Sequence, residues 1–359
     1  KKSNKAMIYA GAGLSTAAGI GDYASKDING KDIKSRISPY LTKPTYSHYA
    51  LSILFKSLYL KHFIQQNHDG LPQKAGIPQH CINEIHGAWY DPSNPVVKMD
   101  GMLRGDLYES MKYWEEGTDL TISLGTSMCG MNSDCVFHTV ATKALDANVA
   151  LDCIDNSSTP STTNTTPNPD PHPIGGVIIG LQSTQYDNVA ALHIYAKIDD
   201  VMRRLLDALN LDLDVDVSDA GLGLMNYMTN SMHTNTNTDT ELDPNRFIYD
   251  IRYDANGVLT TSDPDPDHNH NHNHTGIGTT QLNLNIDQEV RLVSGPHMGD
   301  SGVIQHIHSD GTIDIIFKHI LNKTKYPDAK PQPFLRKLGS WWVDAAINGT
   351  VPSIPIVNV

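Results

Sequence analysis

The stretch that decides the fold is KAMIYAGAGLSTAAG, residues 5–19. Its apolar run, Ala6 to Ala10, has the length of a buried strand and stops at Gly11. Ser15 and Thr16 can cap a following helix, so the stretch predicts a strand, a glycine turn and a helix. Such a turn lets the backbone approach a phosphate, with free N–H groups at the start of the helix. A tight turn that binds no ligand explains Gly-Ala-Gly equally well.

Further short apolar runs alternate with helical patterns along the first 212 residues. Apolar groups at helical spacing predict helices within 44–61 and 197–211. Four runs of strand length predict buried strands: HFIQQN (62–67), DLTISLGTS (119–127), NVALDCID (148–155) and GGVIIGLQST (175–184). Buried strands that alternate with helices indicate an α/β fold with a doubly wound parallel sheet.

The composition argues against several classes of protein. A net charge of −13 over 359 residues disfavours a nucleic-acid surface, which needs clustered Lys and Arg. No apolar run approaches the ~20 residues that span a bilayer, so no membrane association is expected. The four cysteines have no C-x2-C spacing, which favours a reduced intracellular protein, cytoplasmic or nuclear.

Two composition changes divide the chain. Residues 1–212 are expected to form the main domain, with a low-complexity insertion at 156–173. Residues 213–284 are rich in Asn, Thr and His and are expected to form a largely irregular linker. The linker contains HNHNHNH (268–274), which could bind zinc or nickel nonspecifically and is assigned no metal role.

The C-terminal part is expected to be a small β-barrel or a meander. Within residues 285–322, apolar and polar residues alternate between glycine turns. The segment EVRLVSGPHMGDSGVIQHI (289–307) resembles the KOW motif of small SH3-like barrels, but it carries few basic groups. Contact with a protein partner, or packing, therefore fits better than nucleic-acid binding. Residues 323–359 end in an apolar helix with two tryptophans, which is expected to pack on the main domain.

The longer stretch GAGLSTAAGIGDY (11–23) resembles the first nucleotide motif of the sirtuins, the NAD-dependent protein deacylases. Six later segments resemble the other sirtuin motifs in the same order: KPTYSHYAL (43–51), QNHDGL (66–71), EIHG (84–87), LGTS (124–127), GLQSTQYD (180–187) and AKIDDVM (196–202). Seven motifs in one order identify the main domain as a divergent, Rossmann-like NAD-binding domain of sirtuin type.

The resemblance implies a role for each matching residue. The cofactor-binding residues would be Gly11, Ala12, Gly13 and Ser15 at the NAD pyrophosphate, Asp22 and Tyr23 in the cofactor loop, Gln66 at the nicotinamide ribose, Gly125, Thr126 and Ser127 at the adenosine ribose, and Leu181, Gln182, Lys197 and Ile198 beside the adenine. The catalytic residues would be Asn67, Asp69 and His86, with His86 as the general base on a ribose hydroxyl.

The resemblance also implies the chemistry. The substrate would be an acylated protein or peptide whose own acyl oxygen attacks the ribose carbon as nicotinamide leaves. The enzyme then needs no nucleophile, only a base that is neutral near pH 7. The imidazole of a histidine, with an unperturbed pKa of about 6.5, suits that task.

The chain departs from the sirtuin pattern at four places. In the place of the family's strand that pairs with the acyl-lysine peptide stands PVVKMDGMLRGDL (95–107). Residues 88–124 contain no cysteine, so no structural zinc is expected. Ala24 replaces the arginine of the family's cofactor loop, and His68 occupies a position that is apolar in the family. Three functions stay open: a deacylase with unusual substrates, an NAD-binding or structural protein without deacylation, and an NAD hydrolase or ADP-ribosyltransferase that uses the same pocket. His80 matches no motif and is expected to be a solvated loop residue.

Overall fold

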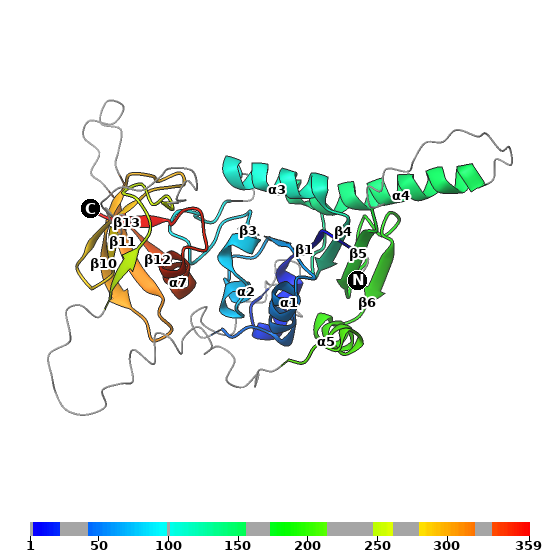
Figure 1. Ribbon diagram of the computed structural model, residues 1–359, viewed down its shortest axis with the longest axis horizontal. Coiled ribbons are helices and arrows are strands. Elements are labelled where there is room, and N and C mark those ends of the chain that lie inside the picture. The colour runs from blue at the N-terminus through cyan, green and yellow to red at the C-terminus, as the bar shows by residue number, and fades with distance from the viewer. Residues whose placement is uncertain are drawn as a thin grey trace, which may run out of the picture.

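The computed structural model contains a parallel sheet covered by helices and a smaller antiparallel sheet beside it (Figure 1). The structure describes residues 3–21, 42–98, 101–155, 173–213, 247–260, 280–319 and 332–359. Among these residues no helix is long and apolar enough to cross a membrane.

The parallel sheet has six strands in the order β3-β2-β1-β4-β5-β6, and every neighbouring pair is parallel. Its strands are β1 (Ala6–Ala10), β2 (His62–Gln65), β3 (Ile82–Glu84), β4 (Leu120–Leu124), β5 (Gly175–Gly180) and β6 (Leu192–Tyr195). The chain winds outward from β1 in one direction and then from β4 in the other. This strand order confirms the predicted doubly wound parallel sheet, with its switch point between β1 and β4.

Helices cover both faces of this sheet because its central strands are apolar on both sides. The helices are α1 (Tyr46–Lys56), α2 (Leu71–Lys74), α3 (Gly105–Gly117), α4 (Cys135–Asp155) and α5 (Ile198–Leu209). Ile8 of β1 packs in one core with side chains of α1 and α5. Met7 and Tyr9, its neighbours along the strand, point to the other face and pack with α3 and α4.

Two local predictions are wrong. Residues 148–155 belong to the end of the 21-residue helix α4 and do not form a strand. Helix α4 as a whole contains four alanines and two leucines, which favour helix, and the sheet position next to β4 is taken by β5, which follows. The glycine turn leads into two 3₁₀ turns, Ala12–Leu14 and Thr16–Ala18, and not into an α-helix. Gly19, in the left-handed region at φ 87°, closes the second turn.

The antiparallel sheet is a meander of β9 (Glu289–Leu292), β10 (Ser301–Ile307), β11 (Ile313–Lys318) and β12 (Pro333–Leu338), with β13 (Ile356–Asn358) added beside β9. Helix α7 (Ser340–Asn348) and the pair β7 (Ile248–Ile251) and β8 (Thr280–Asn283) complete this part. The meander confirms the second of the two expected forms. The KOW resemblance and the divisions at residues 212, 284 and 322 stay predictions.

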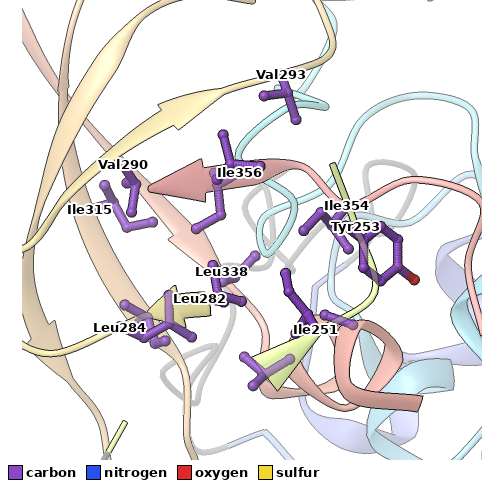
Figure 2. Close-up of a cluster of buried hydrophobic side chains, with 14 of the residues drawn as sticks. Ile251, Tyr253, Leu282, Leu284, Val290, Val293, Ile315, Leu338, Ile354 and Ile356 are labelled. Atoms are coloured by element: carbon purple, nitrogen blue, oxygen red, sulfur yellow. The ribbon is translucent and has the colours of Figure 1, made fainter. Parts of the chain in front are cut away.

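The core of this part joins residues that are far apart in sequence. Figure 2 shows Ile251 and Leu282 from the β7–β8 pair beside Val290, Ile315 and Ile356 of the five-stranded sheet. All five are at most 3% exposed. The residues from 247 to 359 that the structure describes therefore share one hydrophobic core, which the parallel sheet does not enter.

Helix α7 contacts the parallel-sheet part through Trp341. Its ring packs edge-on against Tyr90 with centroids 5.5 Å apart, and its Nε1 donates a hydrogen bond to Gln79 Oε1 at 3.0 Å. A Cβ atom at Gly70, which has φ +65°, would lie 2.7 Å from the Trp341 ring. Gly339 N also donates to the Tyr90 carbonyl at 2.9 Å. The C-terminal part thus packs close to the loops that follow β2 and β3.

Candidate functional site

The loops that follow β1, β2, β3 and β4 meet at one edge of the parallel sheet. Parallel strands present their carboxyl ends at the same edge, and the switch point in strand order opens a crevice there in this class of sheet. The loops carry the predicted groups Gly11–Ser15, Gln66–Asp69, His86 and Gly125–Thr126. The structure brings them together through the hydrogen bonds and backbone contacts described below.

The two glycine loops touch through their backbones. Gly13 N donates to the Gly125 carbonyl at 2.8 Å. A Cβ atom at Gly13 would lie 2.7 Å from that oxygen, and one at Gly11 would lie 2.7 Å from Thr126 Cβ. Any side chain at either position would push the loops apart. Glycine is required here for close approach, which is the property that phosphate-binding turns use.

Two amides at the end of β2 connect this strand to both glycine loops. Asn67 Nδ2 donates to the Gly11 carbonyl at 2.9 Å and to Ser15 Oγ at 3.1 Å. Gln66 accepts a hydrogen bond from Thr126 Oγ1 at 3.1 Å and donates to the Tyr9 hydroxyl. Gln66 and Asn67 therefore hold the loops after β1 and β4 at a fixed distance.

Asp69 is a buried carboxyl group beside these amides, only 3% exposed. It accepts hydrogen bonds from Ser15 Oγ at 2.7 Å, Leu71 N at 2.9 Å and Gln65 Nε2 at 3.4 Å. Burial raises the pKa of Asp69, and the hydrogen bonds from Ser15 and Leu71 act in the opposite direction. The Ser15 hydroxyl donates to Asp69 and therefore does not cap the 3₁₀ turn Thr16–Ala18.

His86 follows β3 and is 9% exposed. Burial, and then the charge of His68, lower the pKa of His86 to about 4, whereas a hydrogen bond to the backbone of Gln66 raises it. The imidazole is therefore neutral at pH 7 and able to accept a proton. Its Nε2 lies 3.3 Å from Ser133 Oγ.

Ser133 leads to a buried hydrogen-bond chain that sequence analysis missed. Ser133 Oγ lies 2.9 Å from the Tyr9 hydroxyl, and Tyr9 donates to Asp134 Oδ1 at 2.6 Å. Asp134 in turn accepts from Gly130 N and Met131 N, both at 2.8 Å. Burial, followed by the charge of Asp134, raises the pKa of Tyr9 well above its usual value, so its hydroxyl stays protonated. A tyrosine within an apolar strand was the one available signal.

His68 is tied to the loop that carries His86. Its Nδ1 lies 2.8 Å from the Gly87 carbonyl, and because a carbonyl can only accept, Nδ1 carries the proton. The His68 carbonyl accepts from Trp89 N at 2.9 Å. Two hydrogen bonds thus join the loop after β2 to the loop after β3.

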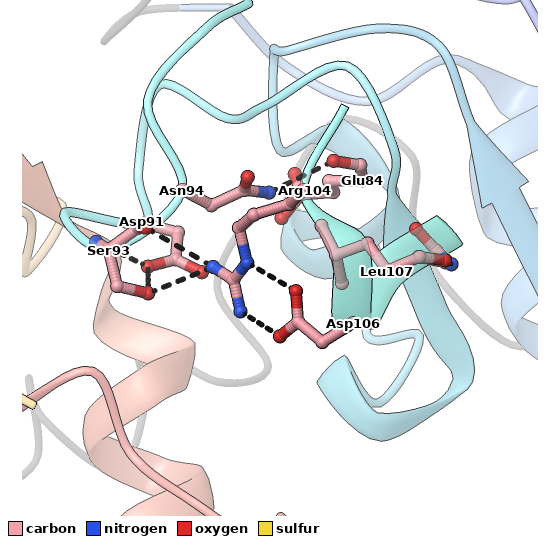
Figure 3. A network of polar contacts seen from close by, with 8 residues as sticks. Glu84, Asp91, Ser93, Asn94, Arg104, Asp106 and Leu107 are labelled. Carbon is pink, nitrogen blue, oxygen red and sulfur yellow. Dashed lines mark hydrogen bonds and ion pairs between the residues drawn. The ribbon is translucent and has the colours of Figure 1, made fainter. Parts of the chain in front are cut away.

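A polar network occupies the segment in which sirtuins carry zinc cysteines (Figure 3). Asp91 Oδ1 accepts from Ser93 N at 2.8 Å and Ser93 Oγ at 2.7 Å, and Arg104 Nη1 donates to the Ser93 carbonyl at 3.2 Å. Asn94 Nδ2 donates to the Glu84 carbonyl at 2.9 Å, which fixes the end of β3. Burial, and then the charge of Asp91, raise the pKa of Glu84 to about 8.

The remaining predicted residues lie away from these contacts. Asp22 and Tyr23 fall outside the described residues. Ala12 begins the first 3₁₀ turn between the two glycines, and Ile198 is buried in the core with α1. The other four are exposed: Ser127, Leu181, Gln182 and Lys197. Apart from Ala12 and Ser127, the predicted residues that the structure describes after β1 to β4 therefore form a cluster, whereas Leu181, Gln182 and Lys197 after β5 and β6 are exposed.

The strand order and the glycine turn at the switch point place the chain among the Rossmann-like α/β proteins. No family model matches the chain. The rat NAD-dependent protein deacetylase sirtuin-7 is 28% identical over 236 residues, which are 57% of this chain and 56% of that protein. The Arabidopsis thaliana NAD-dependent protein deacetylase SRT1 is 28% identical over 256 residues, 59% of this chain and 48% of that one. Drosophila melanogaster Sirt6 is 34% identical over 96 residues, 25% of this chain and 30% of that one.

By sequence the chain is similar to these sirtuins. It spans about half the length of the curated relatives it matches. A solved Sir2 enzyme aligns with 58% of this chain and 94% of its own, at 17% identity and a TM-score of 0.43. The fold assignment rests on the strand order and not on that alignment.

Proposed function

We propose that this protein is an NAD-dependent protein-lysine deacylase. It would cleave the nicotinamide–ribose bond of NAD and transfer the acyl group of a protein or peptide substrate to ADP-ribose. The observation that carries the proposal is the neutral, nearly buried His86, held at the same sheet edge as Asn67, Asp69 and the two glycine loops. The names of the relatives, NAD-dependent protein deacetylases, support it.

The side chains present fit NAD. The close approach at Gly11 and Gly13 suits a pyrophosphate, because no Cβ atom obstructs the backbone there. Asn67, Asp69 and Gln66 are hydrogen-bonded in place and would bind the nicotinamide ribose without further ordering. The adenosine end would be held by Thr126 and Ser127, by the exposed Leu181, Gln182 and Lys197, and by the buried Ile198. No zinc ligand set of four cysteines exists in residues 88–124.

His86 would act as the general base. NAD supplies the ribose carbon that loses nicotinamide, and the substrate supplies the acyl oxygen. With a pKa of about 4, His86 is deprotonated throughout the neutral range, so Nε2 is free to take a proton from a ribose hydroxyl. Once protonated, Nε2 can donate to Ser133 Oγ, and Ser133 can pass its own hydrogen bond to Tyr9. Ser133 and Tyr9 are thus positioning residues that stabilise the charged imidazole.

A second candidate is NAD hydrolysis or ADP-ribosyl transfer in the same pocket. The observation in its favour is that residues 85–98 and 101–104, the described part of the chain between β3 and α3, contain no strand that a peptide substrate could pair with. Water or a protein side chain would then take the ADP-ribose. A catalytically inactive NAD-binding protein is the third reading, motivated by Ala24 in place of the family's arginine.

The proposal is tested by measuring nicotinamide release from NAD with and without an acyl-lysine peptide. His86→Ala is expected to lower the peptide-dependent rate by at least ~100-fold, the usual contribution of a general base. The matched control is His80→Ala, because His80 is exposed and belongs to no described contact of the site. Equal rates in the two variants would remove His86 from the mechanism, and saturable NAD binding without turnover would support the inactive reading.

A further inference from the structure

The antiparallel sheet holds a second convergence of ligating side chains. Within the described ranges, His297, Asp300 and His319 are the one group of three His, Cys, Asp or Glu side chains whose ligand atoms all lie within 4.8 Å of one another. We propose that these three side chains bind a divalent transition-metal ion of the zinc class. The proposal is independent of the deacylase reaction, because the two sites share no residue.

The backbone brings the three residues together. Asp300 N donates to the His297 carbonyl at 3.0 Å, which closes a turn and places these side chains on neighbouring positions of the β9–β10 connection. Gly295 and Gly299 have φ of +76° and +94°, conformations that let the chain make this turn. Ser301 pairs with Lys318 across β10 and β11, so the residues just beyond that pair, Asp300 and His319, lie opposite each other.

The distances are close to those of a metal site. His319 Nδ1 lies 2.8 Å from Asp300 Oδ2, and His297 Nδ1 lies 3.4 Å from the same oxygen. Two ligand atoms bound to one tetrahedral zinc at about 2.0–2.2 Å are about 3.4 Å apart. The His319 side chain is 41% exposed and can rotate to complete the arrangement. Its exposed side would leave the fourth position to water.

The burial of the group indicates a ligand. The Asp300 side chain is 2% exposed, so its carboxylate is held away from water at the centre of the group. His297 Nδ1 is buried and makes no hydrogen bond of good geometry; its one close polar neighbour in the group is Asp300 Oδ2 at 3.4 Å. A buried polar atom in that state costs about 1–3 kcal/mol, and coordination would remove that cost.

The chemistry of the donors selects the ion. Two imidazoles with one carboxylate suit zinc, cobalt or nickel, whereas magnesium and calcium prefer oxygen donors alone. The Arg336 guanidinium, 4.8 Å from the Phe334 ring that packs against His297, adds a nearby positive charge that opposes a cation. Micromolar zinc affinity is therefore expected, weaker than in sites with thiolate ligands.

The test is calorimetric titration of zinc chloride into the full chain after chelator treatment. The tract at 268–274 would bind zinc as well, so the parent for this experiment carries His268→Asn, His270→Asn, His272→Asn and His274→Asn. One zinc ion per chain is expected. His319→Ala and Asp300→Asn are each expected to weaken binding at least tenfold, and zinc should raise the Tm of the parent but not of His319→Ala.

The matched control is His308→Ala. His308 belongs to the same sheet and lies 3.1 Å from a carboxylate, Asp314, but is not part of the three-residue group. Its removal is expected to leave zinc affinity unchanged. Because His319 is nearly half exposed, its alanine variant keeps the fold even where Asp300→Asn does not. No saturable binding to the parent, or the same affinity in His319→Ala and His308→Ala, would overturn the proposal.

Discussion

The carboxyl edge of the parallel sheet has two halves that are built differently. After β1 to β4, backbone and amide hydrogen bonds tie the loops together around the nearly buried Asp69 and His86. After β5 and β6, Leu181 is 69% exposed, and Lys197 at the start of α5 is exposed too. In the proposed reaction the first half meets the reacting end of NAD and the second meets the adenine. Rigid contacts are therefore concentrated where bonds would break.

The largest difference between the halves is expected from adding one methyl group to each. Gly13→Ala places a Cβ atom 2.7 Å from Gly125 O, so the two glycine loops must separate. We expect a loss of about 2–3 kcal/mol in the free energy of unfolding and at least tenfold weaker NAD binding. Gly180→Ala, at the end of β5, has nothing within 4 Å and is the matched control. Urea unfolding measures the stability of both variants, and calorimetric titration measures their affinity for NAD. Equal losses in the two variants would contradict the proposed difference between the two halves.

A pH experiment tests the contribution of Glu84 to stability. This residue ends β3, just before His86 of the buried half. The folded pKa of Glu84 is about 8, above the ordinary 4.5, so the folded protein holds a proton that the unfolded chain releases. Its contribution to stability is complete below pH 4.5 and is lost as the pH rises through 8. Between pH 6 and pH 8 this lowers the free energy of unfolding by about 2 kcal/mol.

Glu84→Gln removes that titration and is expected to flatten the stability profile over this range. Glu116→Gln, on the exposed side of α3, is the control and should leave the slope unchanged. Denaturant unfolding at pH 6, 7 and 8 measures the slopes. A Glu84→Gln profile as steep as that of the parent would show that Glu84 is already ionised at pH 6.

A smaller effect is expected at the hydrogen-bond chain behind His86. Ser133→Ala removes the group 3.3 Å from His86 Nε2, a contact expected to contribute about 1 kcal/mol. Nicotinamide release should fall about three- to tenfold, and the acid limb of its pH profile should move to lower pH because the charged imidazole loses a partner. Ser52→Ala is the control, since Ser52 is buried in α1 with no partner for its hydroxyl among the residues described. An unchanged acid limb would assign Ser133 a merely structural role.

The smallest effect is expected in the exposed half. Leu181→Ala should change the free energy of unfolding by less than about 0.5 kcal/mol, as surface substitutions do. If Leu181 borders the adenine, NAD affinity should fall about two- to fivefold. Calorimetric titration with NAD measures this. A loss as large as that of Gly13→Ala would mean that the open half is the main binding surface.

Local patterns predicted much of the fold. The strands β1, β2, β4 and β5 and the helices α1 and α5 follow from apolar periodicity and turn residues, because each is decided within its own segment. The end of α4 was mistaken for a strand, since a short apolar run fits either structure and only the position of β5 decides between them.

The candidate site was predicted in part for the same reason. Motif order places Gly13, Asn67 and His86 on neighbouring loops, but it does not predict the side chains that hold these residues in position. The contacts between Tyr9 and Ser133, and between Asp300 and His319, join residues that are distant in sequence. Such pairings depend on the strand order and register of the folded sheets, which no short segment encodes.

The central claim is that the buried half of this edge carries out deacylation with NAD. It is tested most directly by quantifying, in one reaction with NAD and an acetyl-lysine peptide, the nicotinamide released and the peptide deacetylated, by mass spectrometry. The account predicts equal amounts of the two, together with an acetylated ADP-ribose. Nicotinamide accompanied by free ADP-ribose and an unchanged peptide would contradict it.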